Sequence, residues 1–275
     1  MRSHPSGVTL SRDQITAIAR RHDQARRGVE QIKRITLEYP DMTIDDAYEC
    51  QRAWVELQLA AGATIVGHKI GLTSRAMQRT MQIDEPDFGT LLDYMVVDSG
   101  ALWRAADFCD PQIEVELAFV LGEQIGGEGV TPEDVVGATA YVVPALELID
   151  ARSYRTDPDD RATRTVRDTI ADNAADAGVV LGTSRVDPRA VDLRWVPAIL
   201  RRNGIVEETG VAAAVLDDPV LGIVWLARRL ARYGVVLEPG EIVLSGSFTR
   251  PVLCRAGDEI VVDYRDLGIV TVQFA

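Results

Sequence analysis

The chain has few of the residues that bind transition metals or form disulfides. It contains three cysteines, Cys50, Cys109 and Cys254, and three histidines among 275 residues. The cysteines are odd in number and far apart, which excludes a disulfide framework and a cysteine-based zinc site. We interpret them as packing residues. A cysteine nucleophile such as Cys254 would have to use His68 as its base.

Long apolar runs and excess positive charge are also missing. No stretch approaches the length of a membrane span, and the first residues contain no apolar segment of the signal type. The net charge is −13, which argues against nucleic acids and anionic membranes as partners. We therefore expect a cytoplasmic protein that acts on a small molecule.

Lysine is the scarcest cation of the chain. Lys33 and Lys69 are the only lysines among 29 basic residues, and Lys69 lies in the glycine-flanked run 67–74. Lysine can release its proton whereas arginine in practice cannot, so Lys69 suggests proton transfer or a point contact with an anion. The alternative is a lysine at the end of a strand with its ammonium group in water.

Three glutamates lie within apolar sequence. Glu114 and Glu116 are two residues apart, so on a strand they point to one face, although the wet face of an ordinary strand has the same pattern. Glu147 has apolar neighbours on both sides, where an ionised carboxylate needs a partner or a metal. If the three meet, they need a divalent cation, and oxygen ligands favour Mg²⁺ or Mn²⁺ over zinc.

The hydrophobic pattern changes near residue 85. Before it we predict helices at 11–38 and 43–62, a strand at 64–70 and a short helix at 74–81. After it we predict helices near 132–136 and 219–233, with strands at 95–97, 114–121, 139–149, 177–181, 193–201, 242–244, 259–264 and 269–274. The prediction is an α+β fold in which a small helical or αβ N-terminal domain, residues 1–84, packs on a mainly β C-terminal domain, residues 85–275.

Several motifs together resemble the fumarylacetoacetate hydrolase superfamily, in particular the hydratase and decarboxylase branch of aromatic meta-cleavage catabolism. The motifs lie in residues 67–78, 85–89, 113–120, 144–152, 168–178, 202–210 and 246–251. The resemblance implies a β-rich C-terminal domain, bound Mg²⁺ or Mn²⁺ and a higher homo-oligomer. It also implies that water adds to 2-oxo-hept-4-ene-1,7-dioate, or to its 2-hydroxydienoate tautomer, to give 4-hydroxy-2-oxoheptanedioate.

The same resemblance implies roles for individual residues. It makes Glu114, Glu116 and Glu147 the metal ligands, and Lys69 and Asp87 the catalytic residues. The substrate-binding residues that it implies are Leu72, Arg75, Asn173, Ser247 and Arg250. Related hydratases carry an aromatic residue in place of His68, so the resemblance implies no role for this histidine.

Other functions fit the same residues. The ligands suit a 2-oxo-3-enedioate decarboxylase of the 4-oxalocrotonate type or a 2-hydroxypenta-2,4-dienoate hydratase equally well. A carbon–carbon bond hydrolase would need a water-activating base, for which His68 is the one candidate. The non-enzyme alternative is an acidic domain that binds a divalent ion for structure.

The segment 150–167 is polar and too long for a tight turn, so we predict either a mobile loop or a lid. Its arginines Arg155, Arg161 and Arg164 are candidates to hold the far carboxylate of a dicarboxylate substrate. Arg75 and Arg250 compete for this role, and a solvated surface loop is the alternative.

Overall fold

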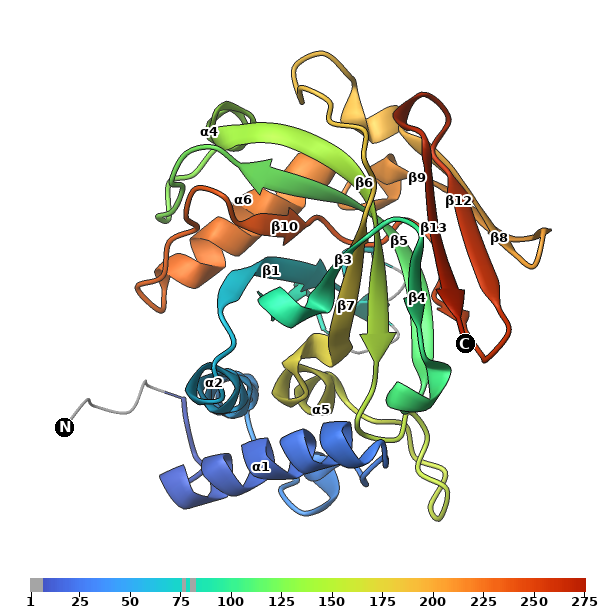
Figure 1. The fold of residues 1–275 in the computed structure, drawn as a ribbon. Helices are drawn as coiled ribbons and strands as arrows, with labels where there is room; N and C mark the ends of the chain where they lie inside the picture. Colours follow the sequence, from blue (N-terminus) through green and yellow to red (C-terminus); the bar gives the residue numbers. More distant parts are fainter. Residues whose placement is uncertain (1–6, 76–77, 80–82) are drawn as a thin grey trace.

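The computed structural model describes residues 7–75, 78–79 and 83–275 (Figure 1). Part of the predicted helix at 74–81 lies outside the described residues. Among the helices of the described ranges, none is both long and apolar enough to cross a membrane.

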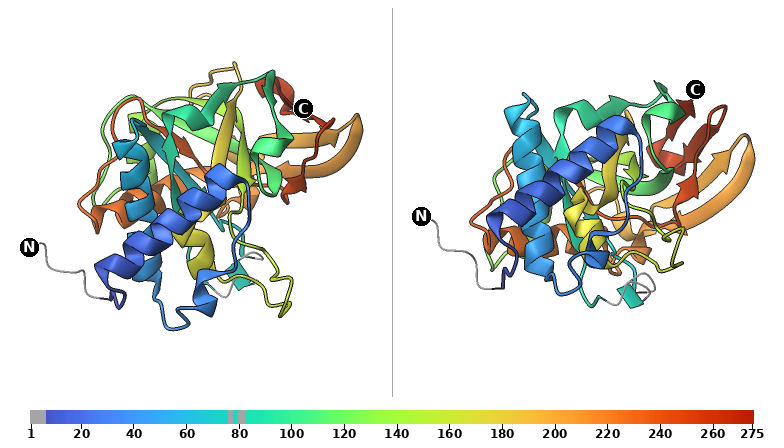
Figure 2. Two further views of the ribbon diagram at one scale, coloured as in Figure 1. Left: turned by 60° about the horizontal axis from the view of Figure 1, so that its bottom comes forward. Right: turned by 90° about the horizontal axis from the view of Figure 1, so that it is seen from below.

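Two helices cross near the N-terminal end of the chain and cover one end of the β structure (Figure 2). Helix α1 spans Arg12–Gly28, and Ser11 caps it in a capping box with Gln14. The predicted helix at 11–38 is too long, because Val29 takes a left-handed conformation with φ 51° and ends α1. A short 3₁₀ turn, Ile35–Leu37, follows.

Helix α2 spans Ile44–Ala60 and begins in the predicted capping box of Thr43 and Asp46. The Asp46 carboxylate also accepts hydrogen bonds from the backbone of Thr9 and Leu10, at 2.8 Å each. One side chain thus caps α2 and fixes the segment that leads into α1.

The larger sheet is mixed and contains the strands in the order β2-β1-β10-β5-β6-β7-β3, with β11 paired to β5. Its strands are β1 Ile65–Gly71, β2 Asp87–Leu92, β3 Val96–Asp98, β5 Pro111–Leu121, β6 Thr139–Asp150, β7 Asp176–Leu181, β10 Ile242–Leu244 and β11 Val252–Leu253. Strand β1 runs parallel to β10 and antiparallel to β2.

This sheet is curled. Strands β2 and β7 are far apart in the strand order and yet lie in contact. Asn173, just before β7, completes the closure, because its carboxamide accepts from the Thr90 backbone N–H at 2.9 Å and donates to the Thr90 carbonyl at 3.0 Å. A side-chain amide thus takes the place of a neighbouring strand.

The second sheet packs on the outer face of the first (Figure 1). Its order is β4-β13-β12-β8-β9, with β4 Ala101–Trp103, β8 Pro197–Arg202, β9 Ile205–Val211, β12 Glu259–Asp263 and β13 Ile269–Phe274. The remaining helices are α4 Pro132–Ala138, α5 Val166–Ala171 and α6 Pro219–Ala231. The alternate β5 residues Ile113, Val115, Leu117 and Phe119 are fully buried in the core.

The predicted α+β class, with a mainly β body, is confirmed. Four strands were not predicted, namely β2, β4, β9 and β11, and residues 193–195 form a 3₁₀ turn rather than the start of a strand. Strand β1, from before the expected boundary, lies inside the larger sheet between β2 and β10. The division at residues 84 and 85 stays a prediction.

Candidate active site

Strands β1 and β2 bring Lys69 and Asp87 together at the inner face of the curled sheet. Their register places Lys69 opposite Gly89, and Gly71 opposite Asp87. A Cβ atom added at Gly71 would lie 2.2 Å from Asp87 Oδ1, and one added at Gly89 would lie 3.2 Å from Lys69 Cε. The two glycines therefore leave room for the two charged side chains.

The Lys69 side chain is almost fully buried, and its Nζ lies 3.0 Å from Glu147 Oε1. Burial alone would lower the pKa of this amine, but the charges of Glu147 and Asp87 raise it above its ordinary value. Lys69 therefore carries an ammonium group among carboxylates.

Three glutamates converge next to Lys69 from the paired strands β5 and β6. Glu114 is opposite Glu147 in the register, and Glu116 follows on the same face of β5. Each of the three offers a carboxylate oxygen, and these oxygens lie within 4.8 Å of one another. The backbone N–H of Gly246 donates to Glu116 Oε2 at 2.8 Å.

The donor set fits a hard divalent cation. Within the described ranges, Glu116 Oε1 and Glu147 Oε2 are buried without a hydrogen-bond partner, whereas Glu147 Oε1 faces the Lys69 ammonium group. Burial and then the charge of Glu147 raise the pKa of Glu114 to about 8 and that of Glu116 well above its usual range. Several buried carboxylates with free oxygens require a cation, and Mg²⁺ and Mn²⁺ prefer such ligands.

Asp87 completes the group and is 1% exposed. Burial raises the pKa of its carboxyl to about 6, although the Lys69 ammonium acts in the opposite direction. Its Oδ1 finds no hydrogen-bond partner in the described part of the chain. An acid with this pKa exists in both protonation states near neutral pH, as proton transfer requires.

The sequence did not single out Asp176, the first residue of β7. It is fully buried, and both of its carboxylate oxygens lack hydrogen-bond partners among the described residues. Burial and the charge of Glu147 raise its pKa well above the usual value, while its own charge raises the pKa of Lys69. Asp176 is thus a further buried carboxylate whose charge is coupled to Glu147 and Lys69, and it lies one residue before the strand predicted at 177–181.

The implied substrate-binding residues divide into two groups. Leu72 follows Gly71 in a left-handed conformation with φ 55°, Asn173 bonds to β2, and Ser247 follows the glycine that binds Glu116. Arg75 is exposed, and Arg250 has an 82% exposed side chain that pairs with Glu208 at 2.6 Å. The structure brings the first group to the site and leaves the two arginines at the surface.

His68 and the cysteines lie apart from this chemistry. Alternation along β1 turns His68 to the face opposite Lys69, where burial lowers the pKa of its imidazole to about 4. Cys50 and Cys254 are buried and Cys109 is partly buried. Burial raises the pKa of each thiol to about 12, so none is an activated nucleophile.

The site and fold define a class of protein. Residues 64–275 match the sequence model described as Fumarylacetoacetate (FAA) hydrolase C-terminal, and the chain belongs to this family. The protein is an enzyme of the family's hydratase and decarboxylase group.

Individual relatives are similar over almost the whole chain. The chain is 54% identical to 2-oxo-hept-4-ene-1,7-dioate hydratase of Escherichia coli, over 94% of this chain and 97% of the relative. It is 35% identical to 4-oxalocrotonate decarboxylase of Pseudomonas sp. (strain CF600), over 97% and 98% of the two chains. A structure of 4-oxalocrotonate decarboxylase from Pseudomonas putida G7, complexed with magnesium and adipate, matches with a TM-score of 0.92 and 34% identity, over 98% of this chain and 100% of that one.

Proposed function

We propose that the protein hydrates 2-oxo-hept-4-ene-1,7-dioate, or its 2-hydroxydienoate tautomer, to 4-hydroxy-2-oxoheptanedioate. The observation that carries this proposal is the 54% identity to a hydratase of that substrate along nearly the whole chain. The grouping of Lys69, Asp87 and three glutamates supports it, because a 2-oxo acid needs a cation site and proton-transfer groups for this reaction.

Glu114, Glu116 and Glu147 would hold one Mg²⁺ or Mn²⁺. When bound, such an ion chelates the carboxylate and ketone oxygens of a 2-oxo acid and stabilises negative charge on the ketone oxygen. The curled sheet around the glutamates limits the access of water, which strengthens these electrostatic interactions.

Lys69 and Asp87 would move the protons. One of them gives a proton to the far end of the dienolate, which shifts the remaining double bond into conjugation with the ketone. Water then adds at the carbon β to the ketone: the second group takes up the proton that the water releases, and the resulting enolate receives a proton at the carbon between the ketone and the new hydroxyl. Each transfer contributes on the order of 100- to 10,000-fold to the rate.

Leu72, Asn173 and Ser247 are our proposed substrate contacts on the walls of the site. We further propose a cytoplasmic homo-oligomer, with residues 1–84 and 85–275 as its two domains. Exposed apolar side chains on the second sheet, Leu102 at 63% and Ile269 at 57%, support an interface between copies. Analytical ultracentrifugation of the purified protein tests the assembly.

Decarboxylation of a 2-oxo-3-enedioate is the second candidate function. It is favoured by the TM-score of 0.92 to 4-oxalocrotonate decarboxylase, and it uses the same carboxylates. The test is incubation with 2-hydroxydienoate diacids and Mg²⁺ while ultraviolet absorbance and carbon dioxide release are both followed. Loss of absorbance without carbon dioxide indicates hydration, and stoichiometric carbon dioxide indicates decarboxylation.

A further inference from the structure

The polar segment after β6 is an ordered hairpin in the structure. In residues 153–164, here called the 153–164 hairpin, Thr156 pairs with Thr163, and the Arg164 N–H donates to the Arg155 carbonyl at 3.0 Å. Its base pairs with the N-terminal segment through Ile32 and Ser153. The backbones of Arg155 and Arg164 are therefore held next to each other.

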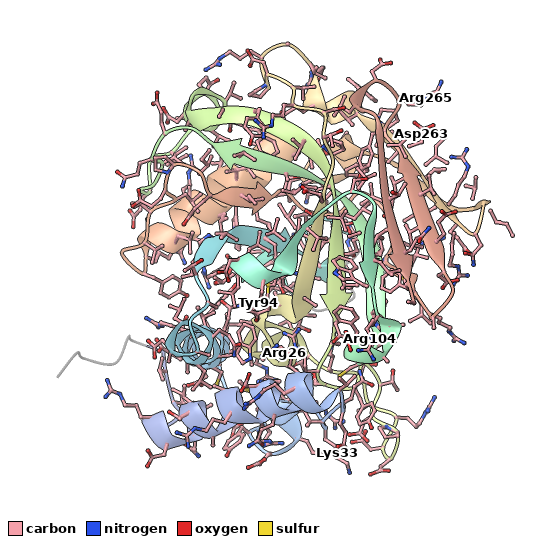
Figure 3. The ribbon with its side chains drawn as sticks, in the orientation of Figure 1. Arg26, Lys33, Tyr94, Arg104, Asp263 and Arg265 are labelled. Atoms are coloured by element: carbon pink, nitrogen blue, oxygen red, sulfur yellow. The ribbon has the colours of Figure 1, made fainter. Side chains whose placement is uncertain are left out.

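Ion pairs at its tip hold the hairpin against the segment that follows α1. Lys33, labelled in Figure 3, pairs with Asp159, and Arg34 pairs with Asp160 at 2.7 Å. These contacts are exposed or partly exposed and lie at the far end of the hairpin from Arg164. A substitution in these ion pairs can therefore loosen the hairpin without changing Arg164.

Arg164 is a buried cation with little compensation. It is 8% exposed, and within the described residues its guanidinium makes one hydrogen bond, of 3.4 Å to the Ser153 carbonyl, and no ion pair. A guanidinium has five N–H donors, and a buried charge is costly unless it is paired and hydrogen-bonded. Such an arginine is suited to an anion that arrives from outside the chain.

The carboxylates whose charges act on Arg164 already accept hydrogen bonds from other groups. Asp172 accepts from the backbone N–H of Arg152 at 2.8 Å and from its Nε at 2.6 Å. Asp168 accepts from the N–H and hydroxyl groups of Thr36 and Thr165, all at 2.8 to 2.9 Å. Neither aspartate makes an ion pair with Arg164 among the described residues, so the two carboxylates compensate its charge only from a distance.

Arg164 and Arg155 lie close enough to the site for their charges to act on it. The charge of Arg164 lowers the pKa of Asp87, and that of Arg155 lowers the pKa of Glu114. Arg155 Nη2 also donates to Gln112 Oε1 at 3.1 Å. Gln112 lies two residues before Glu114 on β5, so both point to the same face of the sheet.

The other arginines fit this role less well. Arg250 is paired with Glu208 and 82% exposed, Arg75 is exposed, and Arg161 is exposed at the turn of the hairpin. None of these three combines burial with a free guanidinium. Among the five candidate arginines, the choice therefore falls on the buried Arg164, with the exposed Arg155 as its neighbour.

We propose that Arg164, assisted by Arg155, binds the substrate carboxylate remote from the three glutamates and so selects dicarboxylates over monocarboxylates. The inference rests on the proposed hydratase function, since it assigns the second carboxylate of that substrate. Arg164 is a specificity residue and takes no part in proton transfer.

The experiment compares Arg164→Gln, Arg164→Lys and Arg155→Gln with Lys33→Ala as the matched control. Lys33→Ala removes the ion pair at the tip of the hairpin and leaves Arg155 and Arg164 in place. For each protein, kcat/KM is measured with the seven-carbon diacid and with 2-hydroxypenta-2,4-dienoate, both with Mg²⁺. Binding of 2-oxoheptanedioate and 2-oxoheptanoate is measured by calorimetry with the same metal.

The expected result is that Arg164→Gln lowers the diacid-to-monoacid ratio of kcat/KM by about 10- to 150-fold, as loss of a charge-assisted contact should. Arg164→Lys keeps a point charge, so it should lower this ratio less than Arg164→Gln does. Arg155→Gln should also lower the ratio less than Arg164→Gln. Lys33→Ala should leave the ratio unchanged. The Tm of Arg164→Gln should be unchanged or higher, because a buried charge without a direct ion pair does not stabilise the fold.

An unchanged ratio in Arg164→Gln, or an equal fall in Lys33→Ala, overturns the proposal. A large drop in the Tm of Arg164→Gln also overturns it, since that would make Arg164 a structural residue. Failure of the function itself looks different. Suppose that the wild-type protein does not hydrate the diacid, but that Arg164→Gln still weakens the binding of 2-oxoheptanedioate relative to that of 2-oxoheptanoate. The hydratase proposal then fails, and the proposal of a dicarboxylate site stands.

Discussion

Glu114 on β5 stands directly opposite Glu147 on β6 in the register of the larger sheet. Like charges directly across two strands destabilise a sheet, and here both strands are long and mostly apolar. Strand pairing therefore forces together two carboxylates that would separate in water. Folding therefore supplies part of the free energy that favours the binding of a cation between these two carboxylates.

Replacing Glu116 or Glu147 by Gln should abolish metal-dependent turnover and leave the fold intact, because each change removes one charged ligand. In the wild-type protein, Mg²⁺ at 100 times its Kd should stabilise the fold by about 2.7 kcal/mol. Differential scanning fluorimetry with and without Mg²⁺ should show this gain in the wild type and in the exposed control Glu133→Gln, and not in the two variants. If both site variants showed the full Mg²⁺-dependent gain in stability, the metal would bind elsewhere in the protein.

Lys69→Arg should lose most of kcat, on the order of 100- to 10,000-fold, because arginine keeps the charge and cannot transfer a proton. The larger guanidinium would also crowd the space that Gly71 and Gly89 leave open. Single-turnover kinetics with Mg²⁺ measure the change. If Lys69→Arg retained near-normal kcat, Lys69 would be an anion anchor only.

Gly71→Ala should reduce activity sharply, because the added methyl group would lie 2.2 Å from Asp87 Oδ1 and displace that carboxylate. Overpacking of this kind costs about 1 to 3 kcal/mol of stability. Gly137→Ala in α4 is the matched control, since a Cβ atom there meets nothing within 4 Å. The control should be as stable as the wild type or slightly more stable, and fully active. Equal activity of the two variants would contradict the packing argument.

The contribution of His68 to protein stability should fall as the pH is lowered from about 6.5 towards 4, opposite in sign to the contribution of buried carboxyls such as Asp87, whose pKa is raised. Burial lowers the pKa of this imidazole to about 4, so the unfolded chain takes up a proton in this range before the folded protein does. The contribution of His68 is complete above pH 6.5 and is lost as the pH falls through 4, to an extent on the order of 3 kcal/mol.

His68→Phe should reduce this pH dependence. The measurement is the free energy of unfolding in urea at pH 7.5, 6, 5 and 4.5 for both proteins. Glu241, whose Oε2 lies 3.8 Å from His68 Nδ1, has a raised pKa and titrates in both proteins, so the difference between the two slopes reports His68. Identical slopes would show that His68 is not held neutral by burial.

The sequence was sufficient to predict that Lys69 and the three glutamates meet, and insufficient to predict the rest of the site. The spacing of Glu114 and Glu116, the apolar setting of Glu147 and the glycines around Lys69 are local signals, and the structure brings these four residues together. Their catalytic and metal-binding roles stay predictions until the variants are measured.

The rest depends on long-range pairing. Strand β2 contains Asp87 and Gly89, which have low strand propensity, and it is fully buried through its neighbours rather than through its own composition. Asp176 becomes part of the site through the pairing of β7 with β6, which no local pattern reveals. The end of α1 at Val29 follows from a left-handed residue that periodicity does not predict.

The position of β1 between β2 and β10 has a consequence for biosynthesis. Lys69 leaves the ribosome early, but the strand that carries it gains its parallel neighbour only when residues 242–244 have been made. Until then one edge of β1 is unpaired and open to pairing with other chains. A nascent or truncated chain that lacks the C-terminal strands should therefore depend on chaperones more than the full-length protein does, and should have no working site.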